Sequence, residues 1–270
     1  MYLTAKTPCG FCESRTTKIS NEHVFAGWVG VVLGADQGKT KTVRHGLRRE
    51  SRPPREWEAN EFDHKVRMAC TRCNAGWMAD LERAVAPLIT PMILGNAGAF
   101  KLRDQLTVAT WAVKTAMVQE YVYPGRHYFT QEERRALMND AVPNQLGARV
   151  WAGRYSQRPN GLHGLSARLV NRDRALDACV SMFSLGQFAL QVFVERLSAG
   201  QAVRPAWHAG PWDQLLIGIW PPPRFADIDG VGLMWPPTRS ITSEGMFYEV
   251  FSRFAALRPK RPFDSHKSQS

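Results

Sequence analysis

The sequence predicts an α+β protein, because helical and strand-like patterns both occur along its length. Residues 1–99 carry two Cys-x-x-Cys pairs, short alternating runs and one helical pattern, which together predict a small metal-braced module. Residues 100–257 carry a long helical pattern and several strand-like runs, which predict a mixed α+β region of unknown fold and role. We therefore expect two domains, 1–99 and 100–257, followed by a basic disordered tail over 258–270.

Four of the five cysteines form two close pairs, Cys9 with Cys12 and Cys70 with Cys73. Two residues separate the members of each pair, and two such pairs supply the four thiolates of a closed structural zinc site. The long gap between the pairs is tolerable, because the entropy of loop closure grows only logarithmically with length. The alternative is four ordinary buried or disulfide-bonded cysteines. Cys179 stands alone in an apolar run and is predicted to be a core residue.

The composition restricts the location and the partners of the chain. The first residues lack the apolar core of a signal peptide, so we expect a cytoplasmic protein in which paired thiols bind metal rather than form disulfides. No stretch reaches the roughly 18 uninterrupted apolar residues of a membrane span, so no membrane partner is expected. The formal net charge of +11 favours a polyanion such as nucleic acid. The sequence leaves the oligomeric state open.

The densest basic stretch runs from residue 39 to residue 55 and contains a single acid, Glu50. Its glycines and prolines predict an extended loop. Because this stretch lies between the two cysteine pairs, we expect it to contact the phosphates of DNA; a solvated charged loop is the alternative. The predicted phosphate contacts are Arg44, Arg48, Arg49, Arg52 and Arg55.

The elements of the first region follow from its local patterns. A short strand is expected to end at His23, and residues 65–70 alternate polar and apolar side chains as a half-buried strand does. Residues 74–85 place apolar side chains at helical spacing, which predicts a helix directly after the second cysteine pair. Pro91, Gly95 and Gly98 predict a hinge after that helix.

The second region begins with a long, largely buried helix over 102–122. Thr130 and Glu133 form a capping box that predicts the start of a second helix. A final helix is expected over about 243–257. Strand-like runs lie between these helices, and Gly186 joins two of them: 148–151, 165–170, 180–183, 188–194 and 214–220.

Three residues near the cysteine pairs carry the candidate chemistry. A single zinc would bring Glu22 and His23, which follow the first pair, close to Asn74, which follows the second. A carboxylate and an amide oxygen suit a hard cation such as Mg²⁺ or Mn²⁺, whereas thiolates suit Zn²⁺. A histidine beside a phosphate that such a metal holds can act as a general base on water.

These motifs together resemble the HNH endonuclease superfamily, the ββα-metal nucleases with a zinc-knuckle brace. The resemblance covers roughly residues 8–90 and rests on the following motifs: Cys9-x-x-Cys12, Asn21-Glu22-His23-Val24-Phe25, Cys70-x-x-Cys73-Asn74 and Gly76-Trp77. It implies an HNH-like module with His23 as general base and Glu22 as a ligand of the catalytic metal. Asn74 stands at the final position, which a histidine ligand usually fills. The central asparagine of the motif has no clear match; Asn60 is a candidate, and His64 or His45 can also enter the site.

The resemblance implies a metal-dependent DNA endonuclease that hydrolyses phosphodiester bonds. One alternative is a catalytically inert, zinc-braced nucleic-acid-binding protein. Another is a redox protein, since four cysteines also hold iron in a rubredoxin-like site. The pair of Glu22 and His23 favours the nuclease, because neither binding nor electron transfer needs a base and a hard ligand there.

Overall fold

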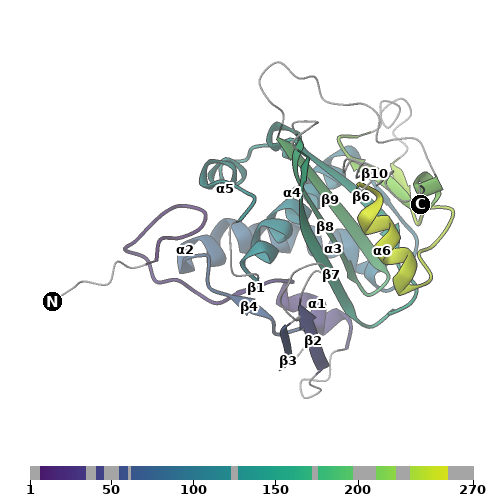
Figure 1. Ribbon diagram of the computed structural model, residues 1–270, viewed down its shortest axis with the longest axis horizontal. Helices are drawn as coiled ribbons and strands as arrows, with labels where there is room; N and C mark the ends of the chain where they lie inside the picture. Colours follow the sequence, from purple (N-terminus) through teal and green to yellow (C-terminus); the bar gives the residue numbers. More distant parts are fainter. Residues whose placement is uncertain are drawn as a thin grey trace, which may run out of the picture.

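The computed structural model describes residues 7–34, 41–45, 55–59, 62–122, 127–171, 176–196, 211–222 and 232–254 (Figure 1). The predicted disordered tail over 258–270 lies outside these residues. The fold is mixed α+β, as the sequence predicts.

A five-stranded antiparallel sheet forms the centre of the molecule (Figure 1). Its strand order is β10-β6-β9-β8-β7, so each strand-like run of the second region becomes a strand. The hairpin between β8 and β9 turns at Gly186, whose φ of +54° is a conformation that glycine adopts at no steric cost. The strands are β6 (Ala148–Arg154), β7 (Leu162–Asn171), β8 (Leu176–Leu185), β9 (Phe188–Arg196) and β10 (Leu216–Trp220).

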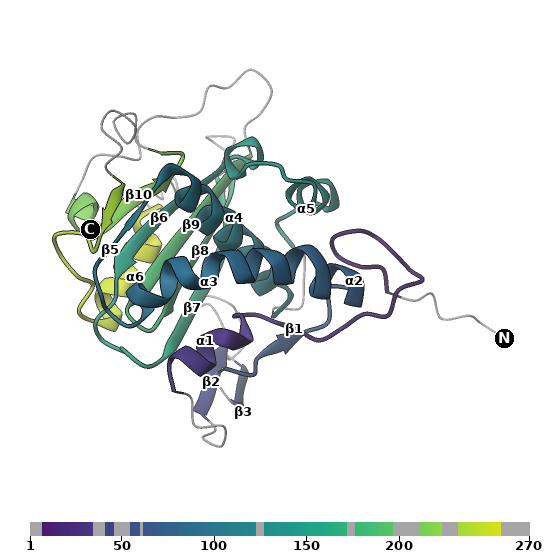
Figure 2. The same cartoon turned by 180° about the vertical axis from the view of Figure 1, so that it is seen from behind.

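Helices cover both faces of this sheet. Helices α3 (Ala79–Ile93) and α4 (Leu102–Gln119) lie on one face, and α6 (Glu244–Ser252) lies on the other (Figures 1 and 2). Along β9, Leu190 and Val192 belong to the core beneath α3 and α4, whereas Phe193 belongs to the core beneath α6. The nearly continuous apolar run of this strand therefore follows from burial on both faces.

The remaining helices agree with the predicted starts and differ in where they end. The helix predicted over 102–122 is α4 followed by a 3₁₀ turn, Glu120–Val122. Thr130 caps α5 (Gln131–Met138) through the predicted capping box, and Ser243 caps α6. Helix α3 continues through Pro91, where a hinge was predicted, and the chain leaves it at Gly95, whose φ is +87°. The helix contains two prolines, Pro87 and Pro91, each of which removes one helical hydrogen bond, and α3 packs against α4 and the sheet.

The first region contains two short paired strands followed by helices. Strand β1 (Glu22–His23) pairs antiparallel with β4 (Lys65–Val66), and α2 (Thr71–Cys73) and a π-helical turn, Asn74–Met78, lead into α3. The strand predicted over 65–70 is thus only two residues long, with an isolated bridge from Ile19 to Cys70 beyond it. Helix α1 (Gly27–Val32) follows β1.

The basic stretch is not an extended loop throughout. Strand β2 (Lys41–His45) lies within it and pairs with β3 (Arg55–Ala59), which begins at its last residue, so that Val43 lies opposite Trp57. Thr42, Val43 and Trp57 have high strand propensity, which the glycines and prolines between the two strands obscured in the sequence. A separate pair joins β5 (Gly98–Phe100) to β11 (Leu233–Trp235).

One hydrophobic core spans the predicted boundary at residue 99. Phe11 and Val29 from the first region belong to the same buried cluster as Trp111 of α4 and Phe183 of β8. The two predicted domains therefore pack on a common core.

Candidate functional site

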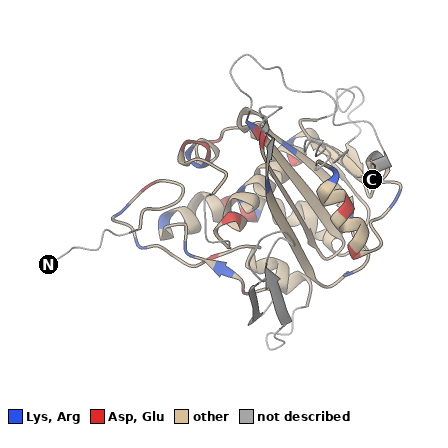
Figure 3. Cartoon of the chain, viewed as in Figure 1, with Lys and Arg blue, Asp and Glu red and all other residues tan. Residues whose placement is uncertain are grey.

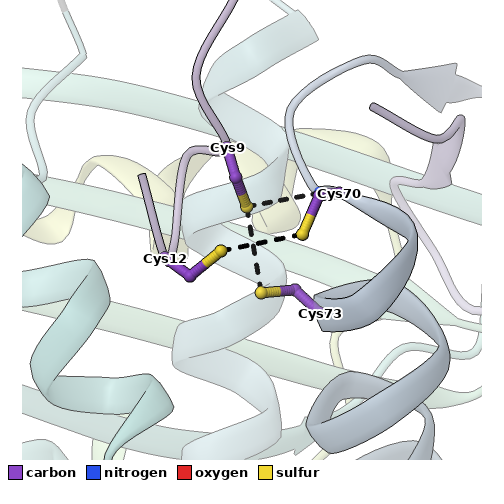
Figure 4. A group of neighbouring side chains, drawn as sticks. All are labelled: Cys9, Cys12, Cys70 and Cys73. Atoms are coloured by element: carbon purple, nitrogen blue, oxygen red, sulfur yellow. Dashed lines mark hydrogen bonds between the residues drawn. The ribbon is translucent and has the colours of Figure 1, made fainter. Parts of the chain in front are cut away.

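The four paired cysteines converge on one point, as their spacing predicts (Figure 4). All four Sγ atoms lie within 4.8 Å of one another. The Sγ atoms of Cys9 and Cys73 are 3.8 Å apart, and those of Cys12 and Cys70 are 3.6 Å apart. A regular tetrahedron with Zn–S bonds of about 2.3 Å has edges of about 3.8 Å, so the thiols fit a metal ion such as zinc.

Backbone contacts hold the two cysteine loops together. The Gly10 N–H donates to the Met68 carbonyl at 2.7 Å, and the Cys70 N–H donates to the Cys9 Sγ at 3.3 Å. Gly10 also lies against Tyr121, because a Cβ at this position would come within 2.9 Å of the Tyr121 hydroxyl. Helix α5 supports the same loop, since Arg134 donates to the Gly10 carbonyl at 2.9 Å.

Burial and hydrogen bonding give the thiols of Cys12, Cys70 and Cys73 different pKa values. Burial raises the pKa of Cys70 and of Cys73. Burial also acts to raise the pKa of Cys12, but hydrogen bonds from the Ser14 backbone and the Arg72 guanidinium outweigh it and lower the pKa to about 6. Cys70 and Cys73 therefore carry protons at neutral pH that a metal ion has to displace.

His23 lies on the exposed side of the β1–β4 pair. Its Nε2 is 3.3 Å from the Asp63 Oδ1, and 34 % of its side chain is accessible to solvent. Asp63 also forms an ion pair with Lys65, the residue directly opposite His23 in the strand register. Hydrogen bonding to Lys65, and then to His23, lowers the pKa of Asp63, which is therefore a carboxylate at neutral pH. No local sequence pattern points to Asp63, which lies two residues before β4 and comes near His23 only in the folded chain.

Glu22 points to the opposite side of the same strand pair, into the core. Its carboxylate lies 3.4 Å from the Lys114 Nζ, and the same ammonium lies 2.8 Å from the Glu82 Oε1. The Lys114 side chain is only 1 % exposed. Burial raises the pKa of Glu22, and the charge of Lys114 opposes that rise. The sequence signal for this network is Lys114, a lysine within a largely apolar stretch of helix.

Asn74 is held at the junction of the second cysteine pair and the strand pair. Its Nδ2 donates to the Ser20 Oγ at 3.0 Å, and the Ser20 hydroxyl donates to the Ala69 carbonyl at 2.9 Å. Glu22 and Asn74 thus have different interaction partners. Their ligation of Mg²⁺ or Mn²⁺ stays a prediction. Within the described ranges, the four cysteines are the one group of three or more histidine, cysteine or acidic side chains placed to hold a metal.

The predicted DNA contacts stay predictions for a different reason. Arg48, Arg49 and Arg52 lie outside the described residues, as does Asn60. The backbone places Arg44 opposite Glu56 in the β2–β3 hairpin and His45 opposite Arg55. The His64 carbonyl accepts a hydrogen bond from the Val24 N–H at 2.9 Å, next to β4.

Comparisons with known proteins add no assignment. No family model matches the chain, and no curated protein or solved structure matches it. Among the helices that the structure describes, none is both long enough and apolar enough to cross a membrane.

Proposed function

We propose that this protein is a metal-dependent DNA endonuclease of the HNH type, in which His23 is the general base. The observation that carries the proposal is the pair of His23 and Asp63 on the exposed side of β1 and β4. A helix follows these strands, and the four cysteine Sγ atoms lie within 4.8 Å of one another. This order of elements is the one that the resemblance implies for residues 8–90.

The His23–Asp63 contact suits general-base chemistry. When the Nε2–H donates to the Asp63 carboxylate at 3.3 Å, Nδ1 keeps the lone pair that accepts a proton. The carboxylate also holds the ring in one orientation. His23 would then take a proton from a water molecule as that water attacks a backbone phosphate.

The cysteine tetrad has a structural role in this proposal. Zinc held by Cys9, Cys12, Cys70 and Cys73 would fix the strand pair against α3 and so place His23. A divalent metal, when bound, would stabilise the negative charge that develops on the leaving oxygen. Glu22 and Asn74 are its proposed ligands, and Glu22 has to give up its contact with Lys114 to serve as one.

The test is cleavage of supercoiled plasmid by zinc-loaded protein with added Mg²⁺ or Mn²⁺. His23→Ala should lose on the order of 10²–10⁴ in rate, the usual contribution of a general base. Asp63→Asn should lose less, because it removes only the group that orients the ring. His127→Ala is the matched control, since His127 is also a partly exposed histidine that contacts another side chain. Full cleavage by folded His23→Ala protein would refute the proposed base.

A second candidate is a zinc-braced nucleic-acid-binding protein without activity. The engagement of Glu22 by Lys114 favours it, because a buried ammonium already neutralises the predicted metal ligand. Binding of DNA without cleavage across Mg²⁺, Mn²⁺ and other divalent metals would support this candidate over the nuclease.

A further inference from the structure

A cavity of about 540 Å³ lies beside the first cysteine loop. Most of its lining comes from the segment that links this loop to β1, and one residue comes from the chain just after β4. Its lining residues are Thr7, Thr16, Thr17, Lys18, Ile19 and Arg67.

The cavity presents cations and hydroxyl groups together. Lys18 and Arg67 are both exposed, and in the part of the chain that the structure describes no carboxylate lies within 4.0 Å of either cationic group. The Ser14 hydroxyl lies 3.0 Å from the Thr17 hydroxyl and accepts the Thr17 N–H at 3.2 Å. These contacts hold the turn that precedes Lys18. A guanidinium, an ammonium and hydroxyl donors match the oxygens of a phosphate group.

The cavity is tied to the elements that carry His23. The Lys18 carbonyl accepts the Thr71 N–H at 2.9 Å, and Ile19 forms a bridge with Cys70. Arg67 follows β4 directly, and Lys65 of β4 lies opposite His23. Figure 3 shows Lys and Arg positions along the first loop, α2 and β4, on the side of the molecule that carries the N-terminus.

We propose that this cavity binds backbone phosphates of nucleic acid and so positions the strand whose neighbouring phosphate reaches His23. The inference rests on the proposed function, because it assigns the substrate-binding surface of the same site. Contacts of this kind go to phosphate oxygens, so they set register and affinity and read no base sequence.

The experiment measures binding of a short fluorescent DNA duplex over a range of salt concentrations. It uses full-length, zinc-loaded His23→Ala protein, so that no chelator is needed to prevent cleavage. Each phosphate contact contributes about −0.9 to the slope of log affinity against log salt. Lys18→Ala/Arg67→Ala should therefore flatten the slope by about 2 and weaken binding at least about tenfold at low salt, equally for two unrelated sequences.

The matched control is Lys101→Ala/Arg103→Ala, which removes one lysine and one arginine charge at the N-terminal end of α4, outside the cavity lining. Zinc content and circular dichroism confirm that both double variants fold. Arg67→Lys keeps the charge and should retain most of the slope, while it loses the two-pronged guanidinium contact. A slope for Lys18→Ala/Arg67→Ala equal to that of the control overturns the proposal.

The outcomes separate the cavity from the proposed activity. Wild-type protein that cuts DNA, combined with an unchanged salt slope in the double variant, rejects the cavity and keeps the nuclease. A flattened slope, combined with no cleavage by wild-type protein, supports the cavity and rejects the nuclease. The absence of any duplex binding by the His23→Ala protein rejects the cavity whatever the cleavage result.

Discussion

The first region and the five-stranded sheet share one core, yet their strands differ greatly in length. Strands β1 and β4 are two residues long each, whereas β8 has ten residues and pairs along its length on both sides. A pair as short as β1–β4 is not stable alone in water, so it needs support from the shared core and from the cysteine cluster beside it. The sheet depends instead on apolar side chains that helices cover on both faces.

Helix α4 connects the two regions and shows the difference on one element. Trp111 packs edge-on against Phe183 of the sheet, with ring centroids 6.0 Å apart. About one helical turn further along α4, Lys114 forms ion pairs with Glu22 and Glu82 of the first region. On α4, a buried ion-pair network therefore faces the first region, whereas an aromatic contact faces the sheet.

Loss of zinc should have the largest effect on stability. It should destabilise the first region much more than the sheet. Cys70→Ser removes one of four metal ligands, and structural zinc sites contribute on the order of 10 kcal/mol to folding. We expect residues 7–34 and 62–78 to lose protection in hydrogen exchange, while the sheet keeps most of its protection. Cys179→Ala is the control, because it removes a buried cysteine of the sheet and should leave zinc content unchanged. Full protection of both segments in zinc-free protein would contradict the proposed dependence on metal.

Removal of the buried ammonium should have the next largest effect. Lys114→Met leaves Glu22 and Glu82 without the cation between them, and breaking a buried ion pair costs about 3–5 kcal/mol. Chemical denaturation measures this loss. The loss should be smaller at low pH, because burial already raises the pKa of Glu22 and its protonated form needs no cation.

The control for the buried network replaces all three charged groups. Lys114→Met/Glu22→Gln/Glu82→Gln should recover much of the lost free energy of unfolding, since no uncompensated charge remains. A Lys114→Met protein as stable as wild type at both low and neutral pH would show that the network contributes nothing.

A cavity in the sheet should destabilise the protein without changing the metal site. Leu190 is fully buried beneath α3 and α4, and Leu→Ala at such positions costs about 2–5 kcal/mol. We expect Leu190→Ala to lower the free energy of unfolding while the folded protein keeps its zinc affinity. Leu94→Ala is the matched control, because Leu94 is 52 % exposed. A large drop in the zinc affinity of folded Leu190→Ala protein would show that the two regions are not energetically separate.

The smallest expected effect concerns pH: the contribution of Glu120 to the free energy of unfolding should fall as pH rises, whereas zinc affinity should rise. Burial raises the pKa of Glu120, whose carboxylate accepts the Tyr128 and Phe129 N–H groups, to about 7. The folded protein therefore binds a proton that the unfolded chain releases above its ordinary pKa of 4.5. Between these two values the free energy of unfolding falls as pH rises, by at most about 3 kcal/mol from this group.

Glu120→Gln should flatten this part of the stability profile between about pH 5 and about pH 8. Zinc affinity should change in the opposite direction, rising with pH, because Cys70 and Cys73 have raised pKa values and must lose protons to bind metal. Identical pH profiles for the wild type and Glu120→Gln would exclude Glu120 as the source.

Local patterns were sufficient to predict most elements. The capping box at Thr130, the turn at Gly186 and the helical spacing after Cys73 each depend on neighbours within a few residues, and each appears where predicted. The hairpin of β2 and β3 was missed because glycines and prolines dominate the pattern between them. The true length of β4 was missed because alternation continues past the last paired residue.

The cysteine cluster and the strands of the second region could be predicted from the chain alone, since spacing and local residue patterns encode both. The partners of the candidate site residues are seen only in the folded chain. Asp63, just before β4, contacts His23 of β1. Lys114 contacts Glu22, which is 92 positions away in the sequence. The physical reason is that the packing of helices and strands chooses such pairs, and residues distant in sequence carry no local signal that they will meet.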